Sequence, residues 1–382
     1  MTRWLCVLAL SGFLLGDGEA WSGATAAKPQ CDNAGSAGEP TPSRAYGTFA
    51  MTSDGDRFVV TVDDGRWSGL FVYAVATGKL VWQRALSSPA SSMALSPSGD
   101  ALALAYAVRP SGCPHVELFN GIDGQDLPPL QDRGELSSVM NDAAQTVVFA
   151  RDGALVAAAL RNAVRVWHVS SGRNVSIIEP PGFGTRRGIE QVGQLAFSPD
   201  GNRIAGVSAR RPAVYIWDVR TGRLERTLTL GKFAGSFGSI VFNGSGSLLA
   251  AGSTGPIAIW RWRAGTLTGE IAPPPAGPIG PVGFQNDMKL AVNGPGKLEL
   301  WDVSKRIPAR DPDWQSSAEI TDAAFVVRSG ELVGIISDSV WETEASRSGR
   351  IRLIAMRSGS TISSLEVPGR PTGSTMPRDG AH

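Results

Sequence analysis

The sequence has too few histidines and cysteines to build the common metal and nucleophile sites. It contains three of each, and the histidines are scattered along the chain at His115, His168 and His382. It contains no HExxH, CxxCH or paired CxxC spacing, so it does not support a zinc or c-type haem site. It also lacks a Gly-x-Ser-x-Gly elbow and a phosphate-binding Gly-Lys-Ser/Thr loop. The sequence therefore predicts no catalytic residues, no metal site and no cofactor.

An excess of charge of either sign is also absent. The 36 basic side chains nearly balance the 35 acidic ones, for a net charge of +1. A protein that binds nucleic acid or an anionic membrane usually carries a clear basic excess. We therefore expect neither as a partner, and the expected partner is another protein.

Long hydrophobic runs are missing except at the N-terminus. The apolar stretch Trp4–Leu15 has 12 residues and follows the basic Arg3, whereas a membrane-spanning helix needs about 20 apolar residues. This layout is typical of a secretory signal peptide, expected over residues 1–20, with cleavage as late as residue 26 as an alternative. The other interpretation is an N-terminal membrane anchor. The signal predicts an exported protein, periplasmic or extracellular, with no transmembrane segment after its removal.

Removal of the signal leaves two cysteines, Cys31 and Cys113. In an oxidising compartment such a pair is expected to form a disulfide, and two free thiols are the alternative.

Sustained helical periodicity is absent beyond the N-terminus, and a repeated unit is present instead. The clearest copy begins at the turn Phe197–Gly201. It continues to the apolar run Val214–Trp217 and closes with a second turn that ends at Gly222. Seven such runs end in an aromatic or bulky anchor, at Tyr73, Phe119, Trp167, Trp217, Trp260, Trp301 and Ile354. The anchors are spaced by roughly 47 residues, close to the ~40–45 of four-stranded propeller blades.

Turn residues bound each unit on both sides. Gly, Asp, Asn and Ser dominate these turns because they tolerate left-handed backbone angles or bond their own backbone. Between the turns lie short, apolar segments that suit β-strands, such as Arg203–Val207 and Leu248–Gly252. The pattern predicts an all-β protein of seven units with four strands each.

The chain resembles the WD-repeat β-propeller family on these residues. The dipeptides Trp217-Asp218 and Trp301-Asp302 match the family's motif, while Trp167 and Trp260 keep only its tryptophan. The resemblance implies a seven-bladed β-propeller of four-stranded antiparallel blades over residues 45–368. It leaves an irregular N-terminal segment at 21–44 and a disordered tail at 369–382. The family's Gly-His dipeptide is absent, so its buried Asp-His-Ser-Trp hydrogen-bond relay cannot form here.

The resemblance also implies which loops share a face of the ring. The loop between the second and third strands opens on the same face as the link to the next blade. On that face we expect a basic flank formed by Arg133, Arg161, Arg186, Arg187, Arg210 and Arg211. We expect an acidic-aromatic flank formed by Trp67, Trp314, Trp341, Asp63, Asp64, Asp311, Asp313, Asp338, Glu342 and Glu344.

Loop tryptophans are enriched where partners bind, and the repeat does not require these three. The alternatives are that the charges are ordinary solvated loop residues and that the rings cap blade edges. Two functions compete on this basis. The preferred one is a non-catalytic protein–protein interaction platform, such as an accessory subunit of an envelope complex. The alternative is a propeller hydrolase or lactonase with a metal ion at the central channel.

Overall fold

The computed structural model confirms an all-β chain built from repeated antiparallel sheets. It describes the residues 45–52, 54–63, 68–107, 115–131, 143–161, 163–181, 191–231, 237–253, 256–272, 280–284, 286–294, 297–305, 307–308, 322–326, 331–338, 348–355 and 360–368. The predicted signal peptide, N-terminal segment and C-terminal tail lie outside these ranges, as do Cys31 and Cys113.

In the described part of the chain, consecutive strands form seven sheets, which we number in chain order. Sheet 1 comprises β1 (Ala45–Met51), β2 (Arg57–Asp63), β3 (Ser68–Ala74) and β4 (Lys79–Leu86), and sheet 2 comprises β5 (Ser92–Leu95), β6 (Ala101–Ala105) and β7 (Val116–Asn120). Sheet 3 comprises β8 (Ala144–Phe149), β9 (Leu155–Leu160), β10 (Val164–His168) and β11 (Asn174–Ile178). Sheet 4 comprises β12 (Val192–Phe197), β13 (Arg203–Ser208), β14 (Ala213–Asp218) and β15 (Leu224–Thr229).

Sheets 5 to 7 continue the same pattern of four strands each. Sheet 5 comprises β16 (Phe237–Phe242), β17 (Leu249–Ser253), β18 (Ile257–Arg261) and β19 (Thr266–Ile271). Sheet 6 comprises β20 (Gly280–Phe284), β21 (Lys289–Gly294), β22 (Lys297–Asp302) and β23 (Ile307–Pro308). Sheet 7 comprises β24 (Asp322–Val326), β25 (Glu331–Asp338), β26 (Ser348–Ala355) and β27 (Thr361–Pro368).

Sheet 2 departs from the expected four strands. Within the described residues it has three, and its outer edge continues only as an isolated bridge between Phe119 and Asp126. The backbone N–H of Leu127 still donates to the carbonyl of Leu118, at 3.0 Å. The next residues are Pro128 and Pro129, which have no N–H to donate to a strand partner. The prolines explain why the fourth strand does not form there.

The anchor residues occupy one structural position, at the outer pair of strands. In sheets 1, 3, 4, 5 and 7 the register between the third and fourth strands shifts at the anchor, and the bulge follows Val72, Val166, Ile216, Ile259 and Leu353. The large aromatic anchors Trp217 and Trp260 are fully buried. This equivalence confirms that the sequence repeat is a structural repeat.

The turn glycines have the backbone conformation that their position in the repeat requires. Among the residues that the structure describes, ten glycines have positive φ, and all ten lie in the turns that bound the predicted units. They are Gly55, Gly78, Gly99, Gly124, Gly153, Gly172, Gly201, Gly222, Gly246 and Gly265. Only glycine adopts this left-handed conformation without a steric penalty.

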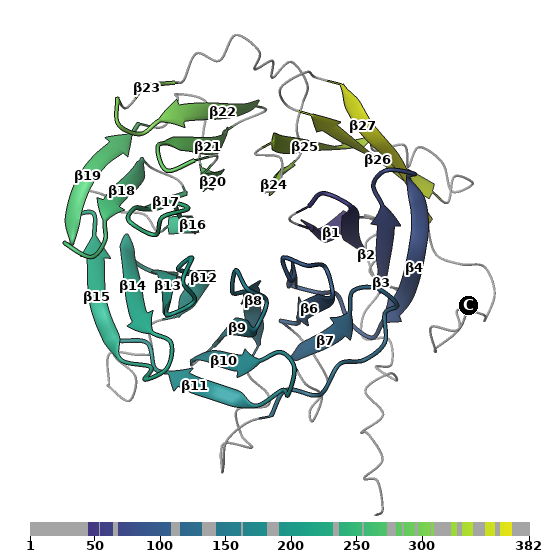
Figure 1. Cartoon of the computed structure of the whole chain (residues 1–382), viewed down its shortest axis with the longest axis horizontal. Helices are drawn as coiled ribbons and strands as arrows, with labels where there is room; N and C mark the ends of the chain where they lie inside the picture. Colours follow the sequence, from purple (N-terminus) through teal and green to yellow (C-terminus); the bar gives the residue numbers. More distant parts are fainter. Residues whose placement is uncertain are drawn as a thin grey trace, which may run out of the picture.

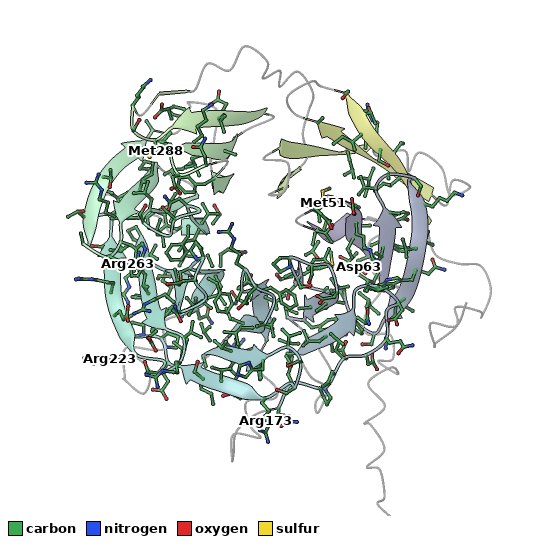
Figure 2. All side chains as sticks on the ribbon, in the orientation of Figure 1. Met51, Asp63, Arg173, Arg223, Arg263 and Met288 are labelled. Atoms are coloured by element: carbon green, nitrogen blue, oxygen red, sulfur yellow. The ribbon has the colours of Figure 1, made fainter. Side chains whose placement is uncertain are left out.

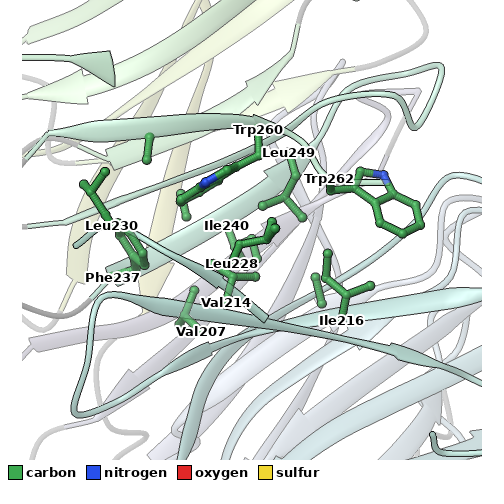
Figure 3. Packing of buried hydrophobic residues seen from close by; sticks show 13 residues of the cluster. Val207, Val214, Ile216, Leu228, Leu230, Phe237, Ile240, Leu249, Trp260 and Trp262 are labelled. Carbon is green, nitrogen blue, oxygen red and sulfur yellow. The ribbon is translucent and has the colours of Figure 1, made fainter. Parts of the chain in front are cut away.

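The core lies between neighbouring sheets rather than within any one of them. One apolar cluster joins Val207 and Val214 of sheet 4 to Leu249 and Trp260 of sheet 5 (Figure 3). Similar clusters join sheets 1 and 2, 2 and 3, 3 and 4, and 5 and 6. Another joins sheet 1 to sheet 7, where Phe71 packs with Leu353. Each sheet therefore depends on its neighbours for burial, as in other repeat architectures.

The sheets are arranged around a common centre, with their first strands innermost (Figure 1). First strands of successive sheets contact one another, and β24 contacts both β20 and β1. Because the strands alternate in direction, each sheet has two distinct ends. One end of each sheet carries the turn between the second and third strands and the link to the next sheet. We call this end the loop end. The opposite end, with the other two turns, is the turn end.

Candidate functional site

Four of the predicted contact residues have described side chains, and all four lie at the loop end. Asp63 ends β2, and its carboxylate accepts a hydrogen bond from the Ser68 hydroxyl at 3.0 Å. This bond ties the end of β2 to the start of β3, so Asp63 has a local structural role. The other three residues, Arg161, Arg210 and Arg211, follow the second strands of sheets 3 and 4.

The loop between β13 and β14 holds its two arginines in a fixed turn. The Ser208 hydroxyl accepts hydrogen bonds from the backbone N–H groups of Arg210 and Arg211, at 3.1 and 3.0 Å. The Arg211 guanidinium then donates to the Tyr215 hydroxyl at 3.2 Å. Arg161, Arg210 and Arg211 are all exposed. The structure thus brings three residues of the predicted basic flank to the same end of neighbouring sheets.

The remaining predicted residues are not described, or only their backbone is. Asp338 ends β25, which places it at the loop end by its strand position. Those outside the described ranges are Trp67, Asp64, Arg133, Arg186, Arg187, Asp311, Asp313, Trp314, Trp341, Glu342 and Glu344. The acidic-aromatic flank therefore stays a prediction.

The inner turns at the turn end, between first and second strands, use their carboxylates to hold the backbone. Asp200 accepts hydrogen bonds from the Ser198 hydroxyl and from the Asn202 backbone N–H. Asp100 accepts from the hydroxyls of Ser96 and Ser98. The hydrogen bonds from Ser96 and Ser98 lower the pKa of Asp100 below its ordinary value. Burial opposes the shift at Asp200, but hydrogen bonds from Ser198 and Asn202 outweigh it and lower that pKa too.

The outer turns, between third and fourth strands, follow the same logic. Asp218 accepts hydrogen bonds from the hydroxyl and the backbone N–H of Thr221, both at 2.8 Å. These two bonds lower the pKa of Asp218. Asp302 is bonded in the same way by Ser304, which lowers its pKa as well. These carboxylates are ionised turn caps, so the turn chemistry accounts for them without a ligand.

The outer turns of sheets 3 to 5 and the strand residues beside them also carry arginines that the sequence analysis did not single out. We call this set the arginine arc: Arg173, Arg220, Arg223, Arg226, Arg261 and Arg263. The labelled members Arg173, Arg223 and Arg263 lie along the outer margin of three successive sheets (Figure 2). A signal was available, because Arg173 and Arg223 directly follow the turn glycines Gly172 and Gly222.

A small polar cluster lies at the loop end of sheet 2. The Tyr106 hydroxyl donates to the Glu117 carboxylate at 2.9 Å, and the Nδ1 atom of His115 lies 2.9 Å from the Tyr106 carbonyl oxygen. The cluster satisfies its own polar atoms, and Tyr106 is fully buried between sheets 1 and 2. It therefore serves packing.

Among the described residues, no three His, Cys, Asp or Glu side chains lie close enough together to hold a metal ion. Nor does any helix in those ranges have the length and apolar character needed to cross a membrane.

Comparison with protein-family models gives no match, and comparison with curated proteins gives none either. The likeness to WD repeats therefore rests on the residues of the repeat and on the antiparallel sheets that they form.

Proposed function

We propose that the chain is an exported, seven-bladed β-propeller of the WD-repeat type that serves as a non-catalytic protein–protein interaction platform. Its partner is an envelope or secreted protein, which it binds as an accessory subunit through loops at the loop end. The equivalent anchors, the shared clusters between neighbouring sheets and the contact of β1 with β24 support a closed ring. In such a ring the packing occupies the strands and leaves the loops free to bind.

The observation that carries the proposal is the group of exposed arginines at the loop end of sheets 3 and 4. Arg161 and Arg210 project from loops whose flanking strands are almost wholly buried, β9 and β10 in one sheet and β13 and β14 in the next. Within the described residues their side chains make no bond that the fold requires. Charged loop residues on a rigid scaffold orient a protein partner and speed its encounter more than they add affinity.

Co-purification of the mature protein from its native envelope tests the platform. We expect a stable partner with wild-type protein and weaker retention with Arg161→Ala/Arg210→Ala, mostly through slower association. Ile122→Ala is the matched control, because Ile122 is exposed at the turn end. A partner lost equally from the control and the double variant, or no partner at all, argues against a platform at this face.

The acidic-aromatic flank has its own variant. Trp314→Ala/Trp341→Ala should release the partner if that flank provides the main contact, because loop tryptophans often dominate binding energy. Unchanged binding by a folded Trp314→Ala/Trp341→Ala protein would remove this flank from the proposal and leave the arginines of sheets 3 and 4.

A further inference from the structure

The members of the arginine arc lie on three sheets that contact one another at their outer strands and outer turns. Arg226 of sheet 4 donates through Nη2 to the backbone carbonyl of Arg263 in sheet 5, at 3.0 Å. On the other side, the turn at Gly222 packs on β11, since a methyl group there would lie 3.0 Å from the carbonyl oxygen of Ile177. The outer turn of sheet 4 therefore packs against the outer strand of sheet 3, and the outer turn of sheet 5 contacts the outer strand of sheet 4.

Several arginines of the arc have no structural task in the described part of the chain. The guanidinium groups of Arg173, Arg223 and Arg261 have no hydrogen-bond or ion-pair partner there. Arg263, by contrast, is held in place: it lies over the Trp262 ring, 4.5 Å from the ring centroid, and donates to the carbonyl of Gly246 at 2.8 Å. The arc thus combines cations fixed by the fold with cations free to bind.

Within the arc, Arg263 lies 4.0 Å from an Asp200 carboxylate oxygen, whereas two carboxylates close to Arg223 in the sequence, Glu225 and Asp218, have other partners. Glu225 accepts hydrogen bonds from Nε and Nη2 of Arg203, at 3.1 and 2.9 Å. Asp218 is occupied by Thr221. An external carboxylate therefore finds Arg173, Arg223 and Arg261 without an internal competitor.

Exposed leucines lie among these cations. Leu224 and Leu267 are 40% and 43% exposed, at equivalent positions beside the anchors Trp217 and Trp260. Leu224 shares a face of β15 with Arg226, because alternate residues of a strand point the same way. A surface with both guanidinium groups and exposed leucines matches a ligand that is both anionic and apolar.

We propose that the arginine arc is a docking surface for an acidic, leucine-bearing segment of a partner protein. The proposal rests on the platform function and names the chemistry of one contact. Arginine binds carboxylates in a bidentate, planar geometry, which favours a peptide's Asp and Glu side chains. A polyphosphate chain fits less well, since it has no apolar group to place against the exposed side chains of Leu224 and Leu267.

The test uses full-length mature protein and a fluorescent peptide of alternating Glu and Leu. We expect binding that weakens as salt is added, because exposed charges are screened. Arg173→Glu/Arg223→Glu should weaken binding about tenfold or more, since two attractions become repulsions. The control is Lys79→Glu/Lys289→Glu, which changes the net charge equally; Lys79 occupies the same place after a turn glycine in sheet 1. It should bind as wild type does.

Two further probes separate the alternatives. A Glu–Ser peptide should bind more weakly than the Glu–Leu peptide if the leucines take part. Equal loss in both charge-reversal variants overturns the proposal, as does a polyphosphate that binds through the arc more tightly than the peptide. Retention of the native partner by Arg173→Glu/Arg223→Glu, with no peptide binding by wild type, would refute the arc and leave the platform intact.

Discussion

At the residue scale, the turn glycines combine two constraints that substitutions can separate. Gly172 has φ of +65°, and a Cβ atom there would overlap the carbonyl oxygen of Pro129. Gly201 has φ of +70°, but its nearest neighbour would be the Ala150 methyl, 4.0 Å away. Left-handed backbone alone costs a residue with a side chain about 1–2 kcal/mol.

We therefore predict a graded loss of stability in three alanine variants, measured by chemical denaturation. Gly201→Ala should lose about 1–2 kcal/mol from its backbone conformation. Gly172→Ala should lose clearly more, because the clash adds to the strain. Gly231→Ala is the control: a Cβ there meets nothing within 4 Å, so it should be neutral or gain up to about 1 kcal/mol. Equal losses at Gly172 and Gly201 would mean that the Pro129 contact does not exist.

The buried tryptophans Trp217 and Trp262 differ in whether their indole N–H groups have a hydrogen-bond partner. Trp217 is fully buried, and its Nε1–H has no hydrogen-bond partner in the described structure. Trp262 is also buried, but its Nε1–H donates to the Gly246 carbonyl at 2.8 Å. A buried donor without a partner costs about 1–3 kcal/mol.

Replacement by phenylalanine should therefore be less damaging at Trp217 than at Trp262. Both changes leave a similar cavity, but Trp217→Phe removes an unsatisfied donor while Trp262→Phe removes a satisfied one. We expect the two losses of unfolding free energy to differ by about 1–2 kcal/mol. The opposite order would show that the Trp217 indole has a partner in solution.

At the scale of elements, the turn between β5 and β6 should respond to acid. Hydrogen bonds from Ser96 and Ser98 lower the pKa of Asp100 in the folded state. The ionised carboxylate therefore stabilises the fold at pH values above the ordinary pKa of 3.8, and this stabilisation is lost as the pH falls through the folded-state pKa. Asp100→Asn should lower the melting temperature at neutral pH, and the difference in melting temperature from wild type should narrow below about pH 4. Thermal melts of both proteins at several pH values measure this difference.

Ser98→Ala provides the graded comparison for this turn. It removes one of the two hydroxyl donors to Asp100. Its loss of stability at neutral pH should therefore be smaller than that of Asp100→Asn, and it should follow the same pH dependence. A gap that stays constant down to acid pH in both variants would show that the carboxylate charge does not stabilise the turn.

The sheets and turns were predictable because their chemistry is local. All ten positive-φ glycines lie where the repeat placed turns, since a left-handed position restricts the residue directly. The shortened sheet 2 also had a local signal, in Pro128 and Pro129. The arginine arc was harder to find, because its members come together only when the outer turn of one sheet packs against the outer strand of the preceding sheet. Residues such as Trp314 lie outside the described ranges, so their site remains a sequence-based prediction.

At the scale of the whole molecule, the contact between sheets 1 and 7 decides how the protein unfolds. Leu353 is fully buried in the cluster that includes Phe71 and Tyr73. In an open array, a defect at the last unit would loosen the terminal sheets and leave the middle ones protected, since each repeat depends on its neighbours. In a closed ring the same defect weakens every sheet, because there is no terminus at which unfolding can stop.

Leu353→Ala distinguishes these two cases by amide hydrogen exchange. The cavity should cost about 2–5 kcal/mol, and in a closed, cooperative ring protection should fall in β14 of sheet 4 as much as in β3 and β26. Leu80→Ala is the control, because Leu80 is 40% exposed in the outermost strand β4; it should change protection little anywhere. Full protection in β14 of Leu353→Ala, with loss confined to sheets 1 and 7, would contradict the closed ring. The loop-end and turn-end surfaces would then not belong to one rigid body, and a partner that spans several sheets could not rely on their fixed spacing.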